Sequence, residues 1–156
     1  MGGYVALKYA QNNPTTFSKI ITYGTKFDWT PESALKETGK LIPEKVEEKV
    51  PQFAAFLAKI HSSNDWKNVM LKTASMMIEL GNTSALTLTD LKSIATPVVI
   101  GIGTNDFMVS VSESEFAASH IPNAELIQLE GFVHPLEQNN PTELVKQLIV
   151  QQRHYS

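Results

Sequence analysis

The feature of this chain that most constrains its fold is an alternation of strand and helix patterns after residue 95. Residues Thr96–Gly103 form an almost continuous apolar run, which is typical of a strand covered on both faces of a sheet. Four further segments complete the pattern: a polar loop (104–108), a helix (110–120), a strand (124–129) and a helix (142–152). Strands that alternate with helices pair in parallel through right-handed crossovers. We therefore predict an α/β fold.

The residues before 28 have the pattern of one more helix and one more strand. Apolar spacing predicts a helix over residues 3–12, which Pro14 ends. The β-rich run Ile20–Tyr23 is closed by Gly24 and predicts a short strand. With the two strands further along the chain, we expect about three parallel strands with flanking helices.

Between residues 28 and 84 the sequence has helix patterns only. Helices are predicted from Pro31, over Pro43–Ile60 and over Asp65–Leu80. The last has an apolar stripe of six residues: Trp66, Val69, Met70, Thr73, Met76 and Met77. Such a stripe more often fills a core than contacts a ligand, although methionine-rich surfaces adapt well to apolar substrates. We therefore predict an α/β part, residues 1–27 and 85–156, and a helical insertion, residues 28–84.

The composition excludes several classes of protein and site. Hydrophobic residues make up 42% of the chain and charged residues 19%, as in a soluble globular domain rather than a disordered one. The net charge is −3 without a basic cluster, so we expect no nucleic-acid partner and no membrane surface. No apolar run reaches the ~18–20 residues that span a bilayer. The chain has no cysteine, which excludes disulfides and thiolate nucleophiles and fits a reducing, cytoplasmic location.

Two loops at the carboxyl ends of predicted strands carry the candidate chemistry. Asp106 follows one strand in Gly103-Thr104-Asn105-Asp106, and His134 follows the next in Gly131-Phe132-Val133-His134. Ligands of parallel sheets bind at these ends. Neighbouring strands lie ~4.8 Å apart, so the carboxylate and the imidazole are expected to meet. Such a pair serves a hydroxyl nucleophile: the histidine takes its proton and the carboxylate holds the imidazole.

Other interpretations of these residues stay open. Asp106 could instead cap the helix that starts near Ser110 or stabilise a turn, and His134 could be an ordinary loop residue. The remaining histidines, which are His61, His120 and His154, lie near predicted helix ends, where a cation is favourable. None has partners at metal-ligand spacing, and no metal site is predicted. The charge run Glu44–Lys49 predicts a solvated helix face.

The first residues, Met1-Gly2-Gly3, resemble the end of a nucleophile elbow of the form G-x-S-M-G-G. Together with the helical insertion and the two loops, in this order, they make the chain similar to the C-terminal part of the α/β-hydrolase-fold family. The resemblance implies that Asp106 is the triad acid, that His134 is the triad base, and that the backbone N–H of Met1 is an oxyanion-hole donor. The serine would lie directly before Met1. Neither Ser110 nor Ser112 lies in a Gly-x-Ser-x-Gly turn that could replace it.

The resemblance also implies a function for the full-length parent. We expect a serine hydrolase of small carboxylic ester, thioester or related acyl substrates, which works through an acyl-enzyme and needs no metal or organic cofactor. The insertion would be a cap that shapes the pocket, with five candidate lining residues: Phe53, Phe56, Trp66, Met70 and Met77. The chain alone would be inactive because the nucleophile is absent. The alternatives are a non-catalytic ligand-binding homologue, or a structural half that needs an N-terminal partner.

The strand at 20–23 has a further consequence in this family frame. It would normally pair with the strand that leads into the elbow, which lies outside the chain. An apolar strand edge without a neighbour invites pairing with another chain. We therefore expect the chain alone to be poorly soluble, to self-associate through this edge or to depend on a partner.

Overall fold

The computed structural model describes residues 1–134 and 136–150. The chain divides into two compact units: residues 1–27 with 86–156, called here the sheet unit, and residues 28–85, called the helical unit. None of the helices in the described part of the chain is long and apolar enough to cross a membrane.

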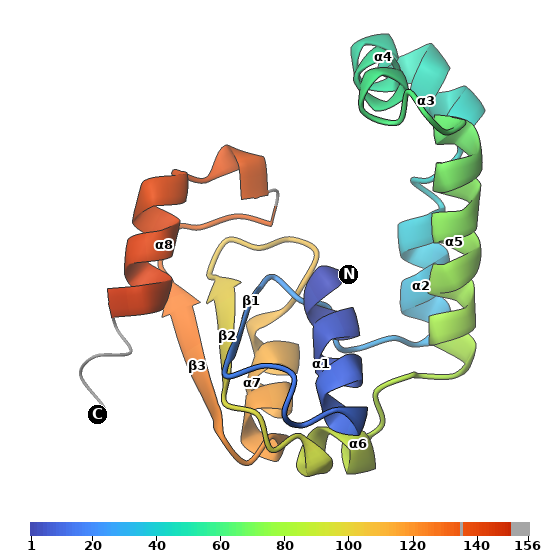
Figure 1. Cartoon of the computed structure of the whole chain (residues 1–156). Helices are drawn as coiled ribbons and strands as arrows, with labels where there is room; N and C mark the ends of the chain where they lie inside the picture. Colours follow the sequence, from blue (N-terminus) through green and yellow to red (C-terminus); the bar gives the residue numbers. More distant parts are fainter. Residues whose placement is uncertain (135, 151–156) are drawn as a thin grey trace. The chain divides into compact units, whose positions relative to one another are not determined.

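The sheet unit contains three parallel strands in the order β1-β2-β3 (Figure 1). The strands are β1 (Ile20–Tyr23), β2 (Val98–Gly103) and β3 (Ala124–Leu129). Val98 of β2 lies in register with Ile20 on one side and with Ala124 on the other. All residues of β2 are buried, as its continuous apolar sequence predicts for a central strand. The prediction of about three parallel strands is confirmed.

Helices cover both faces of this sheet. Helix α8 (Pro141–Val150) packs Leu144 and Leu148 against a cluster that includes Val99 and Ile127. Helices α1 (Gly2–Asn12) and α7 (Val111–His120) contact the strands and lie on the side opposite α8 in Figure 1. The sheet unit therefore has the layered arrangement of an α/β fold, with the carboxyl ends of the strands and the first turn of α1 at one edge.

Two short helices of the sheet unit were not predicted. Thr87 is the N-cap of helix α6 (Leu88–Ser93). Its hydroxyl accepts a hydrogen bond from the Asp90 backbone N–H, and the Asp90 carboxylate accepts one from the Thr87 backbone N–H. This is a capping box, and its T-x-x-D spacing is visible in the sequence. The 3₁₀ helix η1 (Leu136–Gln138) follows the His134 loop. The predicted end of the last helix at Gln152 lies outside the described residues.

The helical unit contains four helices: α2 (Pro31–Thr38), α3 (Pro43–Lys49), α4 (Pro51–Ile60) and α5 (Trp66–Asn82). The prediction of one helix over Pro43–Ile60 is wrong. Pro51 has no N–H to continue a helix, and its ring pushes Val50 out of the helical region, to φ −138°. Pro51 instead occupies the first turn of α4, where no N–H is needed.

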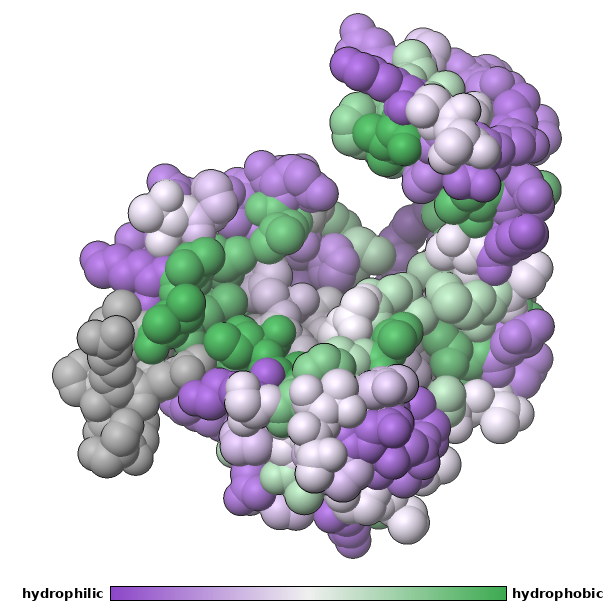
Figure 2. Space-filling model, in the orientation of Figure 1, coloured by the Kyte–Doolittle hydropathy of each residue, from purple (hydrophilic) through white to green (hydrophobic). Residues whose placement is uncertain are grey.

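Packing inside the helical unit uses both large and small side chains. Val46, Ala54 and Met70 form its buried cluster, so Met70 of the predicted stripe fills a core. Helix α2 packs along α5, where a Cβ on Gly81 would lie only 2.6 Å from the Ala34 Cβ. Large apolar side chains of α4 are nevertheless exposed, among them Phe53, Phe56 and Ile60, and apolar surface is visible at this end of the unit in Figure 2.

Candidate active site

The Asp106 carboxylate is fully buried and uses both of its oxygens. Oδ1 accepts hydrogen bonds from the backbone N–H groups of Met108 and Val109, both at 2.8 Å. Oδ2 lies 2.9 Å from Nδ1 of His134, and the Asp106 side chain is 0% exposed. Asp106 thus stabilises the turn after β2 and binds His134 at the same time. It does not cap α7, because Ser110 has that role.

The bond to Asp106 fixes which nitrogen of His134 is available for chemistry. An ionised carboxylate only accepts hydrogen bonds, so Nδ1 carries the hydrogen. In the neutral imidazole Nε2 then has a free lone pair and can accept a proton. The His134 side chain remains 27% exposed, and the exposed ring of Phe107 lies edge-on to the imidazole, with 6.5 Å between the ring centroids. The structure therefore brings together the two residues that the sequence paired.

Gly24, which the sequence analysis named only as the end of a strand, lies against this pair. Its φ is +56°, in the left-handed region that favours glycine. A Cβ at this position would lie 3.2 Å from Asp106 Oδ2 and 3.3 Å from His134 Nδ1. The end of β1 therefore touches the pair that the ends of β2 and β3 provide. A glycine after a predicted strand is a common turn signal, and the sequence around Gly24 did not indicate this contact.

The loop that carries His134 is tied to the loop that carries Asp106. Thr104 Oγ1 accepts a hydrogen bond from Gly131 N–H at 2.9 Å, and Asn105 N–H donates to the Phe132 carbonyl at 3.0 Å. Gly103 permits this approach, because a Cβ there would overlap with the Phe132 carbonyl. These contacts join the carboxyl ends of β2 and β3.

Tyr23 and Asn139 also contact the His134 loop, and the sequence analysis assigned neither of them a role. Tyr23 Oη donates to the Val133 carbonyl at 2.7 Å. Asn139 Nδ2 donates to the same carbonyl at 2.8 Å, and its Oδ1 accepts from Val133 N–H at 3.0 Å. Burial raises the pKa of the Tyr23 phenol, and the Asp106 carboxylate raises it further, whereas a hydrogen bond with Asn139 acts in the opposite direction. The raised pKa favours the neutral phenol, which is the form that donates to Val133.

Met1 precedes the first turn of α1 as its N-cap, and its carbonyl accepts the Val5 N–H at 3.1 Å. Two residues on, a Cβ on Gly3 would overlap with Thr25, which follows Gly24 in the chain. The start of α1 therefore packs against the end of β1, the same segment that touches the pair. Whether the Met1 N–H serves as an oxyanion donor stays a prediction.

Three of the five predicted pocket residues lie around one hollow in the helical unit. This hollow of about 210 Å³ is lined by Leu41, Phe53, Leu57, His61, Trp66, Val69, Met70 and Thr73. Phe56 stacks on Phe53 at 6.4 Å and is not among the lining residues, and neither is Met77. His61, predicted to lie at a helix end, is the C-cap of α4 and lines this hollow.

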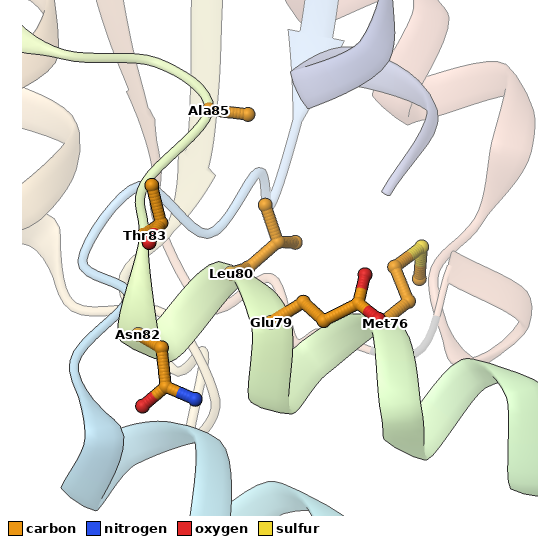
Figure 3. A pocket seen from close by; sticks show the side chains of 6 residues that line it. All are labelled: Met76, Glu79, Leu80, Asn82, Thr83 and Ala85. Carbon is orange, nitrogen blue, oxygen red and sulfur yellow. The ribbon is translucent and has the colours of Figure 1, made fainter.

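A second hollow of the helical unit, of about 370 Å³, lies along the last turns of α5 (Figure 3). Its lining residues are Met76, Glu79, Leu80, Asn82, Thr83 and Ala85. Met76 belongs to the predicted apolar stripe and lines this hollow instead of the one that contains Met70. The stripe thus contributes to two separate hollows.

The other histidines are placed as follows. His120 is in the last turn of α7, with Nδ1 2.7 Å from the Phe116 carbonyl, and His154 lies outside the described residues. Over residues 1–134 and 136–150, no group of three or more His, Asp or Glu side chains is arranged to hold a metal ion.

Comparison with known proteins gives one family match and several structural matches. A family model described as serine aminopeptidase, S33, matches residues 1–141. No curated protein sequence matches the chain. Among solved structures, NosK from Streptomyces actuosus is 19% identical with a TM-score of 0.72, over 98% of this chain and 65% of its own. The α/β hydrolase MGS-M2 from a Medee basin deep-sea metagenome library is 16% identical with a TM-score of 0.62, over 99% and 63%.

A thermophilic esterase from Thermogutta terrifontis is 21% identical with a TM-score of 0.59, over 98% of this chain and 62% of its own. The chain thus spans 62 to 65% of the length of these three structures. These matches confirm the resemblance inferred from the sequence, and the three-stranded sheet with its helices is a partial α/β-hydrolase fold. The chain belongs to the serine aminopeptidase S33 family of α/β hydrolases.

Proposed function

We propose that this chain supplies the acid and the base of a serine hydrolase, and that the parent protein carries the nucleophilic serine in the turn directly before Met1. The observation that carries the proposal is the contact of the buried Asp106 carboxylate with His134 Nδ1 at 2.9 Å. The position of Met1, at a helix start that packs against the end of β1, supports an elbow at this place.

In each half of the proposed reaction His134 takes one proton from the attacking group and returns it to the leaving group. Nε2 takes the serine proton while the serine oxygen bonds to the carbonyl carbon of the substrate. The imidazolium, stabilised by Asp106, then returns the proton to the departing alkoxide or thiolate as its bond to the carbonyl carbon breaks. Water attacks the resulting acyl-enzyme by the same route, which releases the acid and restores the serine.

The site and the relatives support a proposal for the substrate class. We propose a small carboxylic ester, thioester or related acyl compound, with the Met1 N–H as one donor to the oxyanion. The helical unit would act as the cap, and its apolar hollow lined by Phe53, Trp66 and Met70 would suit an apolar acyl group. One structural neighbour is described as an esterase, which is consistent with this class.

The test begins with the coding DNA directly upstream of the Met1 codon, where an in-frame Gly-x-Ser is expected. The parent protein should label with a fluorophosphonate probe and hydrolyse a small aryl ester, whereas the 156-residue chain alone should not label. His134→Gln in the parent should lower kcat/KM at least about a thousandfold. His120→Gln, which changes the same residue type at the end of α7, is the matched control and should leave kcat/KM unchanged.

Other outcomes would replace this proposal. A different residue at the elbow, together with tight ligand binding and no labelling, would indicate a non-catalytic ligand-binding homologue. A separate N-terminal fragment that restores ester hydrolysis when mixed with this chain would indicate a two-piece enzyme. Activity retained in His134→Gln would contradict the assignment of the base.

A further inference from the structure

We infer that Tyr23 and Asn139 are positioning residues that orient His134 by holding the peptide directly before it. The inference rests on the proposed function only in taking His134 as the base. Together with the Val133 backbone, the two side chains make what we call the Val133 clamp. The clamp contacts neither Asp106 nor the His134 ring in any hydrogen bond described above, so it acts through the backbone.

The clamp satisfies both backbone groups of Val133 with side chains. The carbonyl accepts two hydrogen bonds, from Tyr23 Oη at 2.7 Å and from Asn139 Nδ2 at 2.8 Å. The N–H donates to Asn139 Oδ1 at 3.0 Å. Asn139 therefore pairs with Val133 as a neighbouring strand would, although no strand is present at this point of the chain.

Planarity of the peptide bond carries this restraint to the catalytic residue. The Val133 carbonyl shares one rigid plane with the N and Cα atoms of His134. The two donors on that carbonyl restrain this plane, and the bond to Val133 N–H restrains the plane before it. The N and Cα atoms of His134 are thereby held in place, which leaves only its φ angle and its side-chain torsions to bring Nδ1 to Asp106.

The two side chains reach the loop from separate elements. Tyr23 is the last residue of β1, 110 positions before Val133, and it packs beside the α8 cluster. Asn139 directly follows η1, and its own N–H bonds to the Leu136 carbonyl at 3.1 Å. The clamp therefore fastens the His134 loop to the sheet on one side and to the segment leading into α8 on the other.

The chemistry of the clamp requires an amide at position 139. Toward Val133 the side chain uses Nδ2 as a donor and Oδ1 as an acceptor, whereas a carboxylate would offer only acceptors. Asn139→Asp would place an anionic oxygen against the Val133 carbonyl. The next residue gives a matched control, because Asn140 is the acceptor in each described hydrogen bond of its side chain, from the N–H groups of Thr142 at 3.0 Å and Glu143 at 3.1 Å. Asn140→Asp keeps this capping of α8 and adds a charge that suits a helix start.

The experiment follows the His134 imidazole by NMR in the 156-residue chain, with its resonances assigned by their loss in His134→Gln. We expect the wild type to show a hydrogen-bonded Nδ1 proton in slow exchange with water. Asn139→Asp should speed this exchange at least about tenfold, the equivalent of one ordinary hydrogen bond, and Asn140→Asp should leave it unchanged. The amide spectra and unfolding curves of both variants report whether the fold is intact.

Tyr23→Phe is the second variant, and it removes only the hydroxyl. It should give a smaller increase in exchange than Asn139→Asp, because the Asn139 donor remains on the Val133 carbonyl. Tyr9→Phe, at a side chain of α1 that is 51% exposed, is its control and should have no effect. If Asn139→Asp does not fold, the comparison of Tyr23→Phe with Tyr9→Phe decides whether the clamp orients His134.

Two outcomes separate the inference from the proposed function. Unchanged Nδ1 exchange in folded Asn139→Asp, or in Tyr23→Phe, would overturn the positioning role while leaving the acid and base in place. A wild-type His134 without a protected Nδ1 proton would instead contradict the pairing with Asp106, and both proposals would fail.

Discussion

Substitution of Gly24 by alanine tests the geometry of the site most directly, because the added methyl group would be directed at both members of the pair. At φ +56° an alanine experiences left-handed strain of about 1–2 kcal/mol. The stiffer unfolded chain offsets about 0.4–1 kcal/mol of this. The methyl carbon would also lie 3.2 Å from Asp106 Oδ2 and 3.3 Å from His134 Nδ1, closer than an ordinary van der Waals contact.

Gly131 provides the matched control for this substitution. Its φ is +78°, so alanine is strained there as well, but a Cβ would meet no atom within 4 Å. Gly131→Ala should therefore lose about 1 kcal/mol of unfolding free energy through backbone strain alone. Gly24→Ala should lose about 2–4 kcal/mol, because overpacking against the pair adds about 1–3 kcal/mol.

Urea unfolding followed by circular dichroism measures the two free energies, and imidazole NMR reports the pair. Fluorescence is less suitable because both tryptophans, Trp29 and Trp66, are in the helical unit. The His134 Nδ1 proton should exchange faster with water in Gly24→Ala and be unchanged in Gly131→Ala. Equal losses of stability in the two variants, with the same His134 signal, would refute the argument that Gly24 is required by the pair.

Three further predictions use other contacts of the sheet unit. Asp106→Asn should lower the pKa of Tyr23, because the carboxylate no longer repels the phenolate, and the Tyr23 titration is isolated by subtracting the tyrosinate absorbance of Tyr23→Phe. In the wild type the raised pKa means that stability is lost as the pH rises through this pKa. An unchanged Tyr23 titration in Asp106→Asn would contradict the coupling. Tyr4→Phe removes the buried hydrogen bond that the Tyr4 hydroxyl accepts from Leu86 N–H at 2.9 Å, and it should lower the free energy of unfolding in urea by about 1 kcal/mol. Tyr9→Phe should lower it by no measurable amount. Similar losses in both variants would show that the hydroxyl of Tyr4 is unimportant. The chain alone should self-associate through β1, and Ile21→Lys, at a residue that is 43% exposed, should shift it toward monomer in light scattering. A wild-type chain that is already monomeric would rule this out.

The sequence predicted the strands and the longer helices of the sheet unit well, because they have strong local signals, whereas it missed the short helices α6 and η1. The apolar run that became β2 and the loops with Asp106 and His134 follow the general pattern of α/β proteins, so their meeting could be expected. The helical unit was predicted less well. Periodicity alone joined α3 and α4, and the steric effect of Pro51 decided against a single helix.

The supports of the site could not be predicted in the same way. Gly24, Tyr23 and Asn139 are ordinary residues for the end of a strand or a loop, and their roles arise from contacts across the fold. The hydrogen bond from Tyr23 to Val133 joins residues that are 110 positions apart, and a local sequence pattern does not predict contacts between residues so far apart in the chain. The proposed acid and base are residue types whose chemistry a sequence displays, whereas the residues proposed to orient them are recognised only once the strands are in register.

Two of the residues that contact the His134 loop or the Asp106–His134 pair lie at the end of β1, so the orientation of His134 depends on this short edge strand. Gly24 and Tyr23 stand at the end of β1, a strand of four residues that pairs only with β2 among the described strands. Short edge strands open locally at a lower free energy than the strands they border. Opening of β1 would remove the Tyr23 donor from Val133 and the Gly24 backbone from the pair, even while β2 and β3 stay joined. A further strand on the free edge of β1 would therefore order His134 without touching it, which ties the proposed catalytic competence of the parent to the completion of its sheet.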